Sequence, residues 1–217
     1  MLKAVIFDMD GVIIDSEPFH HEVCRRIFKS LGIDVPEEEY FRYIGVSNTN
    51  MWTAIKRKYR LNQSVNELVA MQVFGNMEFM KKERVDPVDG IFELLSGLQE
   101  AGFLIGLASS SPHQIIEMVL DAFNIKQYFD CVVSGADFEN GKPAPDIFLK
   151  AAAMLNVLPE QCVVVEDATH GVHAAKAARM KCIGFINVNS AGQDLCKADL
   201  IIHDLKALDI HNVLSLA

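Results

Sequence analysis

Short apolar runs that alternate with helical patterns constrain the fold of this chain more than any other feature. Each run is rich in β-branched residues and lacks a polar alternation, which is typical of a strand buried on both faces. The runs occupy residues 3–7, 103–108, 131–134, 162–165 and 182–186, and helical patterns lie between the later ones at 90–100, 112–123, 145–155 and 171–180. This alternation predicts an α/β fold with a doubly wound, parallel, Rossmann-like sheet, whose ligands should bind at the carboxyl ends of the strands.

Residues 15–86 interrupt the alternation. Helical patterns follow one another there with no convincing strand between them, at 18–31, 37–43, 50–59 and 64–82. We therefore predict an all-helical domain (residues 15–86) inserted into a Rossmann-like core made of residues 1–14 and 87–217. Because the insertion begins directly after the first strand, it should lie over the carboxyl edge of the sheet as a cap.

The composition excludes several classes of protein. The 217 residues are 50% hydrophobic and carry a net charge of −9, and no apolar run reaches the ~18 residues of a membrane span. Acids stand where a signal peptide would have its apolar run, so we expect a cytoplasmic protein without a nucleic-acid or membrane partner. Residues 15–86 contain eleven basic and eleven acidic side chains, which places the whole excess negative charge in the core.

The five cysteines are odd in number and widely spaced, which favours buried, reduced thiols over disulfides or a zinc site. No heptad repeat or apolar stripe demands a partner subunit, and we expect a monomer or a weak oligomer.

Two carboxylates follow the first strand in the segment Asp8-Met9-Asp10-Gly11-Val12. When the chain leaves the pleat, Gly11 permits a turn that can aim both side chains into one cleft. An Asp-x-Asp-Gly surface turn is the ordinary alternative, and taken singly the motif does not decide between them.

The later strand ends carry polar groups as well. Ser109-Ser110-Ser111-Pro112 could bind an anion at a helix start or simply cap that helix. Lys142 stands beside prolines that fix where its ammonium points, although an exposed loop lysine is the common case. Glu166-Asp167 end the fourth strand with two acids that add nothing to a hydrophobic core.

Four carboxylates at neighbouring strand ends would repel one another, since two charges ~4 Å apart cost ~4 kcal/mol at an effective dielectric of 20. A divalent cation removes this cost. All-oxygen ligation suits Mg²⁺ better than Zn²⁺, which prefers His and Cys ligands. His170 and His173 are interpreted as surface residues of one helix, whereas His20 is expected to face the cleft from the first helix of the cap.

These motifs, in this order, resemble the haloacid-dehalogenase-like hydrolase superfamily, in its branch with a helical cap after the first motif. The resemblance covers essentially the whole chain and implies that Asp8 is the nucleophile, forming an aspartyl phosphate, and that Asp10 is the general acid and base. It further implies that Ser109, Ser110 and Lys142 hold the phosphoryl group. The implied Mg²⁺ ligands are Asp8, Asp10 through its backbone carbonyl, Glu166 and Asp167.

Several activities within this superfamily can be compared on particular residues. Dehalogenases lack the second aspartate of the first motif, which is present here as Asp10. The chain also resembles β-phosphoglucomutase in Asp15-Ser16-Glu17 leading to His20, in Gly45-Val46-Ser47 and in Lys142-Pro143-Ala144-Pro145-Asp146. That enzyme binds a second phosphate with an arginine and a lysine of the cap. Here Asn48 stands at the arginine position, and residues 61–80 contain neither lysine nor arginine. Phosphonatases of this superfamily use a cap lysine near the same position to form a Schiff base, and Asn48 cannot take that role.

We therefore expect a Mg²⁺-dependent phosphatase that hydrolyses a small phosphorylated metabolite, a sugar or polyol phosphate. A hexose-phosphate mutase of the β-phosphoglucomutase type is the alternative, and a non-catalytic binding protein on the same fold is a third hypothesis. The side chains expected to select the substrate are Glu17, His20, Gly45, Ser47, Asn48 and His113.

Overall fold

The computed structural model describes residues 1–83, 85–190, 192–208, 213 and 216. Six parallel strands form one sheet in the order β3-β2-β1-β4-β5-β6. Their bounds are β1 Ala4–Phe7, β2 Leu104–Ser109, β3 Cys131–Ser134, β4 Cys162–Glu166, β5 Lys181–Phe185 and β6 Leu200–Ile202. The order reverses direction beside β1, so the crevice between the ends of β1 and its neighbours is where a doubly wound sheet binds its ligand.

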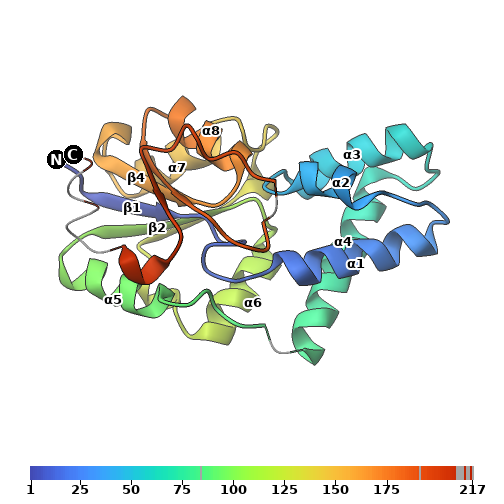
Figure 1. The fold of residues 1–217 in the computed structure, drawn as a ribbon, viewed down its shortest axis with the longest axis horizontal. Coiled ribbons are helices and arrows are strands. Elements are labelled where there is room, and N and C mark those ends of the chain that lie inside the picture. The colour runs from blue at the N-terminus through green and yellow to red at the C-terminus, as the bar shows by residue number, and fades with distance from the viewer. Residues whose placement is uncertain (84, 191, 209–212, 214–215, 217) are drawn as a thin grey trace.

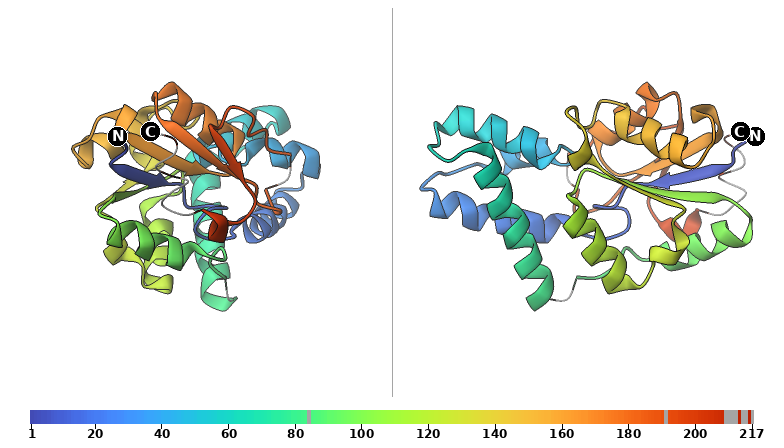
Figure 2. Two further views of the ribbon diagram at one scale, coloured as in Figure 1. Left: turned by 60° about the vertical axis from the view of Figure 1, so that its left-hand side comes forward. Right: turned by 180° about the vertical axis from the view of Figure 1, so that it is seen from behind.

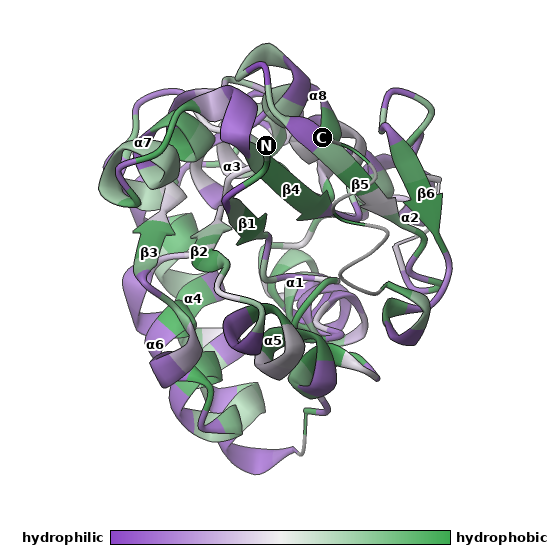
Figure 3. Ribbon diagram, turned by 90° about the vertical axis from the view of Figure 1, so that its left-hand side faces the viewer, coloured by the Kyte–Doolittle hydropathy of each residue, from purple (hydrophilic) through white to green (hydrophobic). Residues whose placement is uncertain are grey.

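Helices cover both faces of this sheet, with α5 (Ile91–Glu100) and α6 (His113–Phe123) on one side and α7 (Asp146–Met154) and α8 (Thr169–Ala177) on the other (Figure 1). Alternate residues of β1 divide between the two layers: Val5 and Phe7 pack with α5 and α6, and Ala4 and Ile6 pack with α7 and α8. Both faces of β1 are therefore buried, which explains its unbroken hydrophobicity (Figure 3).

The predicted fold class is confirmed, and all five predicted strands are present. The strand β6 was not predicted, because three residues at the edge of the sheet are too short to give a periodic pattern.

Within residues 15–83 the structure contains four α-helices, and all of them lie beyond one end of the sheet (Figure 2). They are α1 Glu17–Ser30, α2 Glu37–Tyr40, α3 Asn48–Tyr59 and α4 Val65–Lys82. Their apolar faces enclose a hydrophobic cluster of their own around Trp52, separate from the two clusters that flank the sheet. The chain leaves and returns side by side, since Ile14 bridges Pro87.

Four cysteines are buried and unpaired, as expected, but Cys196 is exposed, and the expectation of burial was wrong for it. Cys196 lies in the irregular segment before β6 rather than within a strand. Among the described residues, no helix combines the length and the apolar character needed to cross a membrane.

Candidate active site

Polar side chains from four strand ends meet at the carboxyl edge of the sheet. Asp8 directly follows the central strand β1, whose neighbours are β2, ending at Ser109, and β4, ending at Glu166. Lys142 reaches the same place from the loop that follows β3. Parallel pairing of β1 with both neighbours thus aligns residues that are far apart in the sequence.

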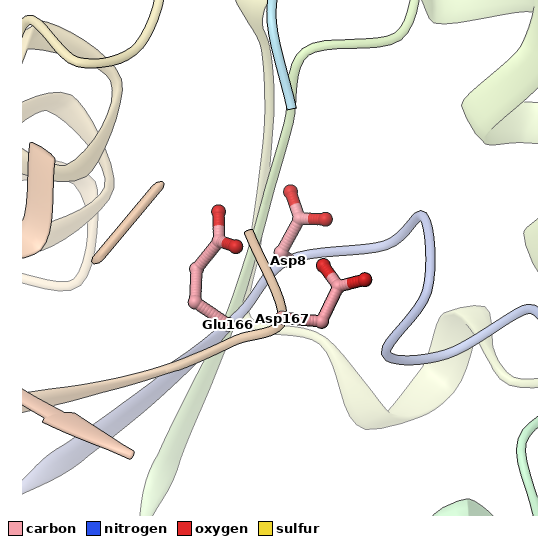
Figure 4. Close-up of side chains that lie close together, drawn as sticks. All are labelled: Asp8, Glu166 and Asp167. Atoms are coloured by element: carbon pink, nitrogen blue, oxygen red, sulfur yellow. The ribbon is translucent and has the colours of Figure 1, made fainter. Parts of the chain in front are cut away.

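Asp8, Glu166 and Asp167 form a buried carboxylate cluster, with one oxygen of each within 4.8 Å of the others (Figure 4). Lys142 lies against it: its Nζ donates to Asp8 Oδ1 at 2.5 Å, to Glu166 Oε1 at 2.6 Å and to the Ala108 carbonyl at 3.2 Å. The second Glu166 oxygen accepts the Ala168 N–H at 3.0 Å. Glu166 therefore holds Lys142 in place with one oxygen and a helix start with the other.

The cluster is electrostatically unbalanced in the absence of a cation. Burial raises the pKa of Asp8 to about 8, Glu166 and Asp10 add to that effect, and Lys142 opposes it. Burial, followed by Glu166 and Asp8, also raises the pKa of Asp167 well above its usual value. Ionisation of all three carboxylates beside one ammonium would leave an excess of two negative charges, which a divalent cation would balance.

The residues of this cluster fit a Mg²⁺ ion. All the available donors are oxygens, as Mg²⁺ prefers. Two glycines also leave room for the carboxylates, since a Cβ at Gly11 would overlap Asp167 and a Cβ at Gly171 would overlap Glu166. The backbone at Gly11 has φ +80°, a conformation that favours glycine over residues with a side chain.

The side chain of Asp10 lies outside that cluster and lines the cleft instead. Its Oδ1 accepts from Ser16 Oγ at 2.7 Å, and its Oδ2 accepts from Ser111 Oγ at 2.8 Å and Ser109 Oγ at 3.2 Å. His20 Nε2 lies 3.7 Å from Oδ1. Hydroxyl donors therefore fix the orientation of this carboxyl, and Asp10 could contribute to a metal site only through its backbone.

A cleft separates this edge of the sheet from the helices α1, α2, α3 and α4. Its floor includes Asp8, Asp10, Ser110, Ser111 and Asp167, and the opposite wall comes from the helical segment. That wall is formed by Glu17, His20, Tyr40, Tyr43, Ile44, Gly45, Val46, Asn48, Met51 and Gln72. No lysine or arginine is among the described residues that line this cleft.

Two polar side chains of α1 face the cleft from positions of strong burial. Burial raises the pKa of the Glu17 carboxyl to about 8, and the carboxylates of Asp10, Asp8 and Asp15 act in the same direction. Burial lowers the pKa of His20, while Asp10 works against that shift. Both groups are thus held towards their neutral forms beside the Asp10 carboxyl.

The structure brings most of the predicted site residues together, but it places two elsewhere. Ser47 is the N-cap of α3, where its hydroxyl accepts the Asn50 N–H at 3.4 Å, and it does not line the cleft. The His113 side chain is 56% exposed at the start of α6 and lies 2.8 Å from Asp137. Ser109 is completely buried beneath Ser110, which lines the cleft and contacts the Gly45 carbonyl at 3.4 Å.

Several residues at the site were not predicted from the sequence. Ser111 follows two predicted serines, so the serine run itself was a usable signal. Gln72 lines the cleft wall, and its Oε1 accepts a hydrogen bond from Trp52 Nε1 at 2.7 Å, a contact across twenty residues. Ser190 donates a hydrogen bond to Asp167 Oδ2 from a loop with no recognisable pattern.

Comparisons with known proteins agree with this geometry. The sequence model of the haloacid dehalogenase-like hydrolases matches residues 5–185. The chain is 33% identical to the phosphorylated carbohydrates phosphatase of Thermotoga maritima, with 98% of each chain covered. It is 34% identical to the β-phosphoglucomutase of Bacillus subtilis, over 96% of this chain and 92% of that one. The crystal structure of β-phosphoglucomutase from Clostridium difficile superposes with a TM-score of 0.88 at 27% identity, covering 99% of this chain and 96% of that chain.

Proposed function

The chain belongs to the haloacid dehalogenase-like hydrolase family, and on this basis we propose that it is a Mg²⁺-dependent phosphatase of small phosphorylated carbohydrates, acting through Asp8. The observation that carries the proposal is the position of Asp8, which lies in contact with Lys142 and within 4.8 Å of Glu166 and Asp167 at the floor of a small cleft. An anionic nucleophile can approach a phosphoryl group only where positive charge offsets the negative charge of the nucleophile and of the phosphoryl oxygens.

In the proposed reaction, a carboxylate oxygen of Asp8 attacks phosphorus and the bond from phosphorus to the ester oxygen breaks. Asp10 gives its proton to the departing alcohol, which leaves an aspartyl phosphate on Asp8. Asp10 then removes a proton from water, whose oxygen attacks phosphorus and regenerates the Asp8 carboxylate with release of phosphate. The hydroxyl groups of Ser16 and Ser111 support this role because they hold the Asp10 carboxyl towards the cleft.

The remaining site residues serve charge balance and position. Asp8, Glu166, Asp167 and the backbone carbonyl of Asp10 would hold Mg²⁺, which supplies positive charge at the phosphoryl oxygens. Lys142 offsets charge on Asp8 and on the transferred group. Ser110, which lines the cleft, would donate a hydrogen bond to that group, whereas the Ser109 hydroxyl donates to Asp10 Oδ2. The helices α1 to α4, which supply one wall of the cleft, would limit access of bulk water to the bound substrate.

The cleft wall supports a neutral polyhydroxy group as the rest of the substrate, consistent with the carbohydrate phosphatase among the relatives. Glu17, Asn48, Gln72 and Tyr43 offer hydrogen bonds to hydroxyl groups, whereas no lysine or arginine of the described lining could neutralise a second phosphate. We therefore expect sugar or polyol monophosphates rather than bisphosphates or phosphorylated acids.

Replacement of the nucleophile tests this function. Asp8→Asn should lower the rate of phosphate release from sugar and polyol monophosphates in Mg²⁺ by at least about 10³-fold, because an amide cannot form the acyl phosphate. The exposed Asp121→Asn on α6 is the matched control and should keep wild-type activity. Retention of activity by a folded Asp8→Asn variant would overturn the proposal, as would the absence of phosphate release by the wild type across the panel.

A hexose-phosphate mutase remains the second candidate, favoured by the 34% identity to a β-phosphoglucomutase. It would use Asp8 in the same way but return the phosphoryl group to a sugar rather than to water. The mutase and phosphatase activities can be separated by supplying β-glucose 1-phosphate and measuring the formation of glucose 6-phosphate and of free phosphate in the same reaction. Isomerisation faster than phosphate release would establish the mutase, and phosphate release alone would exclude it.

A further inference from the structure

The loop that follows β5 contacts three parts of the site although it lies at the far end of the chain. Ser190 Oγ donates to Asp167 Oδ2, Asn187 Nδ2 donates to the Gly11 carbonyl at 2.8 Å, and Asn189 Nδ2 donates to Asp15 Oδ2 at 2.6 Å. We refer to Asn187, Asn189 and Ser190 as the C-terminal clamp.

Ser190 restricts which oxygen of Asp167 is available. Its hydroxyl, buried at 5% exposure, occupies Oδ2, and that same oxygen packs against the Cα of Gly11 so closely that a Cβ there would overlap it. No hydrogen bond from the described residues reaches Oδ1. One oxygen of the Asp167 carboxylate is therefore fixed by the protein, and the other is left for a ligand.

Within the clamp, Asn189 orients the side chain of Asn187. The Asn189 backbone N–H donates to Asn187 Oδ1 at 2.8 Å, which fixes the Asn187 amide so that its Nδ2 faces the Gly11 carbonyl. Asn187 Nδ2 also lies 3.5 Å from Asp15 Oδ1. The contact of Asn187 with Gly11 spans 176 residues of sequence, so the clamp joins Asp167 to the turn that carries Asp10 and Gly11.

From these contacts we propose that Ser190 is a positioning residue for Mg²⁺ binding, which acts by holding the Asp167 carboxylate in the orientation that leaves Oδ1 free. The inference rests on the proposed function, since it takes Asp167 as a metal ligand. Hydrogen bonds from outer residues to a ligating carboxylate commonly change metal affinity by about 10–100-fold. The asparagines support the same geometry from the opposite side by fixing the turn against which Asp167 packs.

Calorimetric titration of the metal-free protein with Mg²⁺ tests the proposal without reference to catalysis. Ser190→Ala should weaken Mg²⁺ binding about 10–100-fold, and raising the Mg²⁺ concentration should restore most of the kcat for phosphate release. Ser190→Cys keeps the connectivity of the side chain but replaces the hydroxyl with a larger thiol that donates only weakly, so it should resemble Ser190→Ala if the hydrogen bond is responsible. Ser96→Ala removes a surface hydroxyl bonded to Glu100 at 3.1 Å and should bind Mg²⁺ as the wild type does.

Equal Mg²⁺ affinity of the wild type and both Ser190 variants would overturn the inference and leave the phosphatase function intact. So would a loss of thermal stability in Ser190→Ala with no change in Mg²⁺ affinity, because a purely structural hydroxyl predicts that result. Failure of the wild type itself to bind Mg²⁺ would overturn both the role of Ser190 and the Mg²⁺-dependent phosphatase function. The phosphate-release assay tests the phosphatase function independently.

Discussion

Lys142 illustrates how one buried side chain can be both structural and chemical. Burial by itself would lower its pKa, but the carboxylates of Asp8 and Glu166 outweigh that effect and raise it above the usual lysine value. Three acceptors use all three of its protons. Its ammonium is thus held charged and fixed in position by three hydrogen bonds, so under the proposed function little rearrangement would be needed when a phosphoryl group binds beside Asp8.

Glu17 gives a prediction at the same scale. Its pKa is raised from 4.5 to about 8, chiefly by burial, so between these values the folded protein holds a proton that the unfolded chain releases. Stability should therefore fall as the pH rises through this window. Glu17→Gln cannot ionise, and its unfolding free energy should exceed that of the wild type by at least about 1 kcal/mol at pH 8.5 but not at pH 4.5.

Thermal melts in EDTA across this pH range provide the measurement, with an expected difference of at least about 2–4 °C at pH 8.5. The exposed Glu160→Gln on the core surface is the control and should track the wild type. If Glu17→Gln and the wild type showed parallel pH profiles, the carboxyl would have to be ionised in the folded protein.

At the scale of elements, the turn after β1 sets the geometry of the site. The Met9 carbonyl accepts the N–H groups of Val12, Ile13 and Ile14, and the Gly11 N–H donates to the Ile14 carbonyl at 2.8 Å. This compact turn ends the strand and sends Asp8 and Asp10 to different places, one to the carboxylate cluster and the other to the cleft. Two acids two residues apart can therefore take different roles.

Gly11→Ala should disrupt this turn in two ways. The positive φ of +80° disfavours alanine by about 1 kcal/mol or more, and the new Cβ would displace Asp167. We expect lower thermal stability, at least about 10-fold weaker Mg²⁺ binding and a corresponding loss of phosphatase activity. Calorimetry and phosphate release measure the last two.

Gly32→Ala is a matched control, because Gly32 has φ +70° after α1 and a Cβ added there would meet nothing within 4 Å. It should show the conformational cost alone, with wild-type Mg²⁺ affinity and activity. Equal effects of the two substitutions would mean that the contact of Gly11 with Asp167 is unimportant.

At the scale of the whole molecule, negative charge is concentrated where an anionic substrate would bind. The net charge of −9 belongs entirely to residues outside 15–86, and the carboxylate cluster lies in that part. A cation is therefore expected to contribute to folding as well as to catalysis, since it binds the folded site and not the unfolded chain.

Mg²⁺ at about 100 times its dissociation constant should stabilise the protein by about 2.7 kcal/mol, which corresponds to a rise of roughly 5–10 °C in the melting temperature. The affinity should increase from pH 6 to pH 8.5, because the raised pKa values of Asp8 and Asp167 mean that protons must leave when the metal binds. Asp167→Asn should lose most of the shift. Sodium chloride of equal ionic strength controls for screening, and an equal shift with that salt would contradict a specific site.

Local sequence pattern was enough to predict the alternation of strands and helices, because strands buried on both faces must be continuously apolar, as in residues 4–7 and 162–165. It also predicted that Asp8 and Asp167 follow the ends of strands and that Lys142 lies in a loop before a helix, since these residues lie in short motifs with recognisable neighbours. The boundaries of the helical segment at residues 15–86 remain a prediction, although its helices have a hydrophobic cluster of their own.

The side chains that complete the site became visible only in three dimensions. Ser190 and Gln72 reach it through contacts that span 23 and 20 residues, and no periodicity of the chain encodes such a contact. The separation of Asp10 from the carboxylate cluster likewise depends on hydroxyl donors that come from the end of β2 and from the start of α1. Local pattern fixes what a segment becomes, whereas the partners of a polar side chain depend on which segments the packed sheet and helices bring within hydrogen-bonding distance.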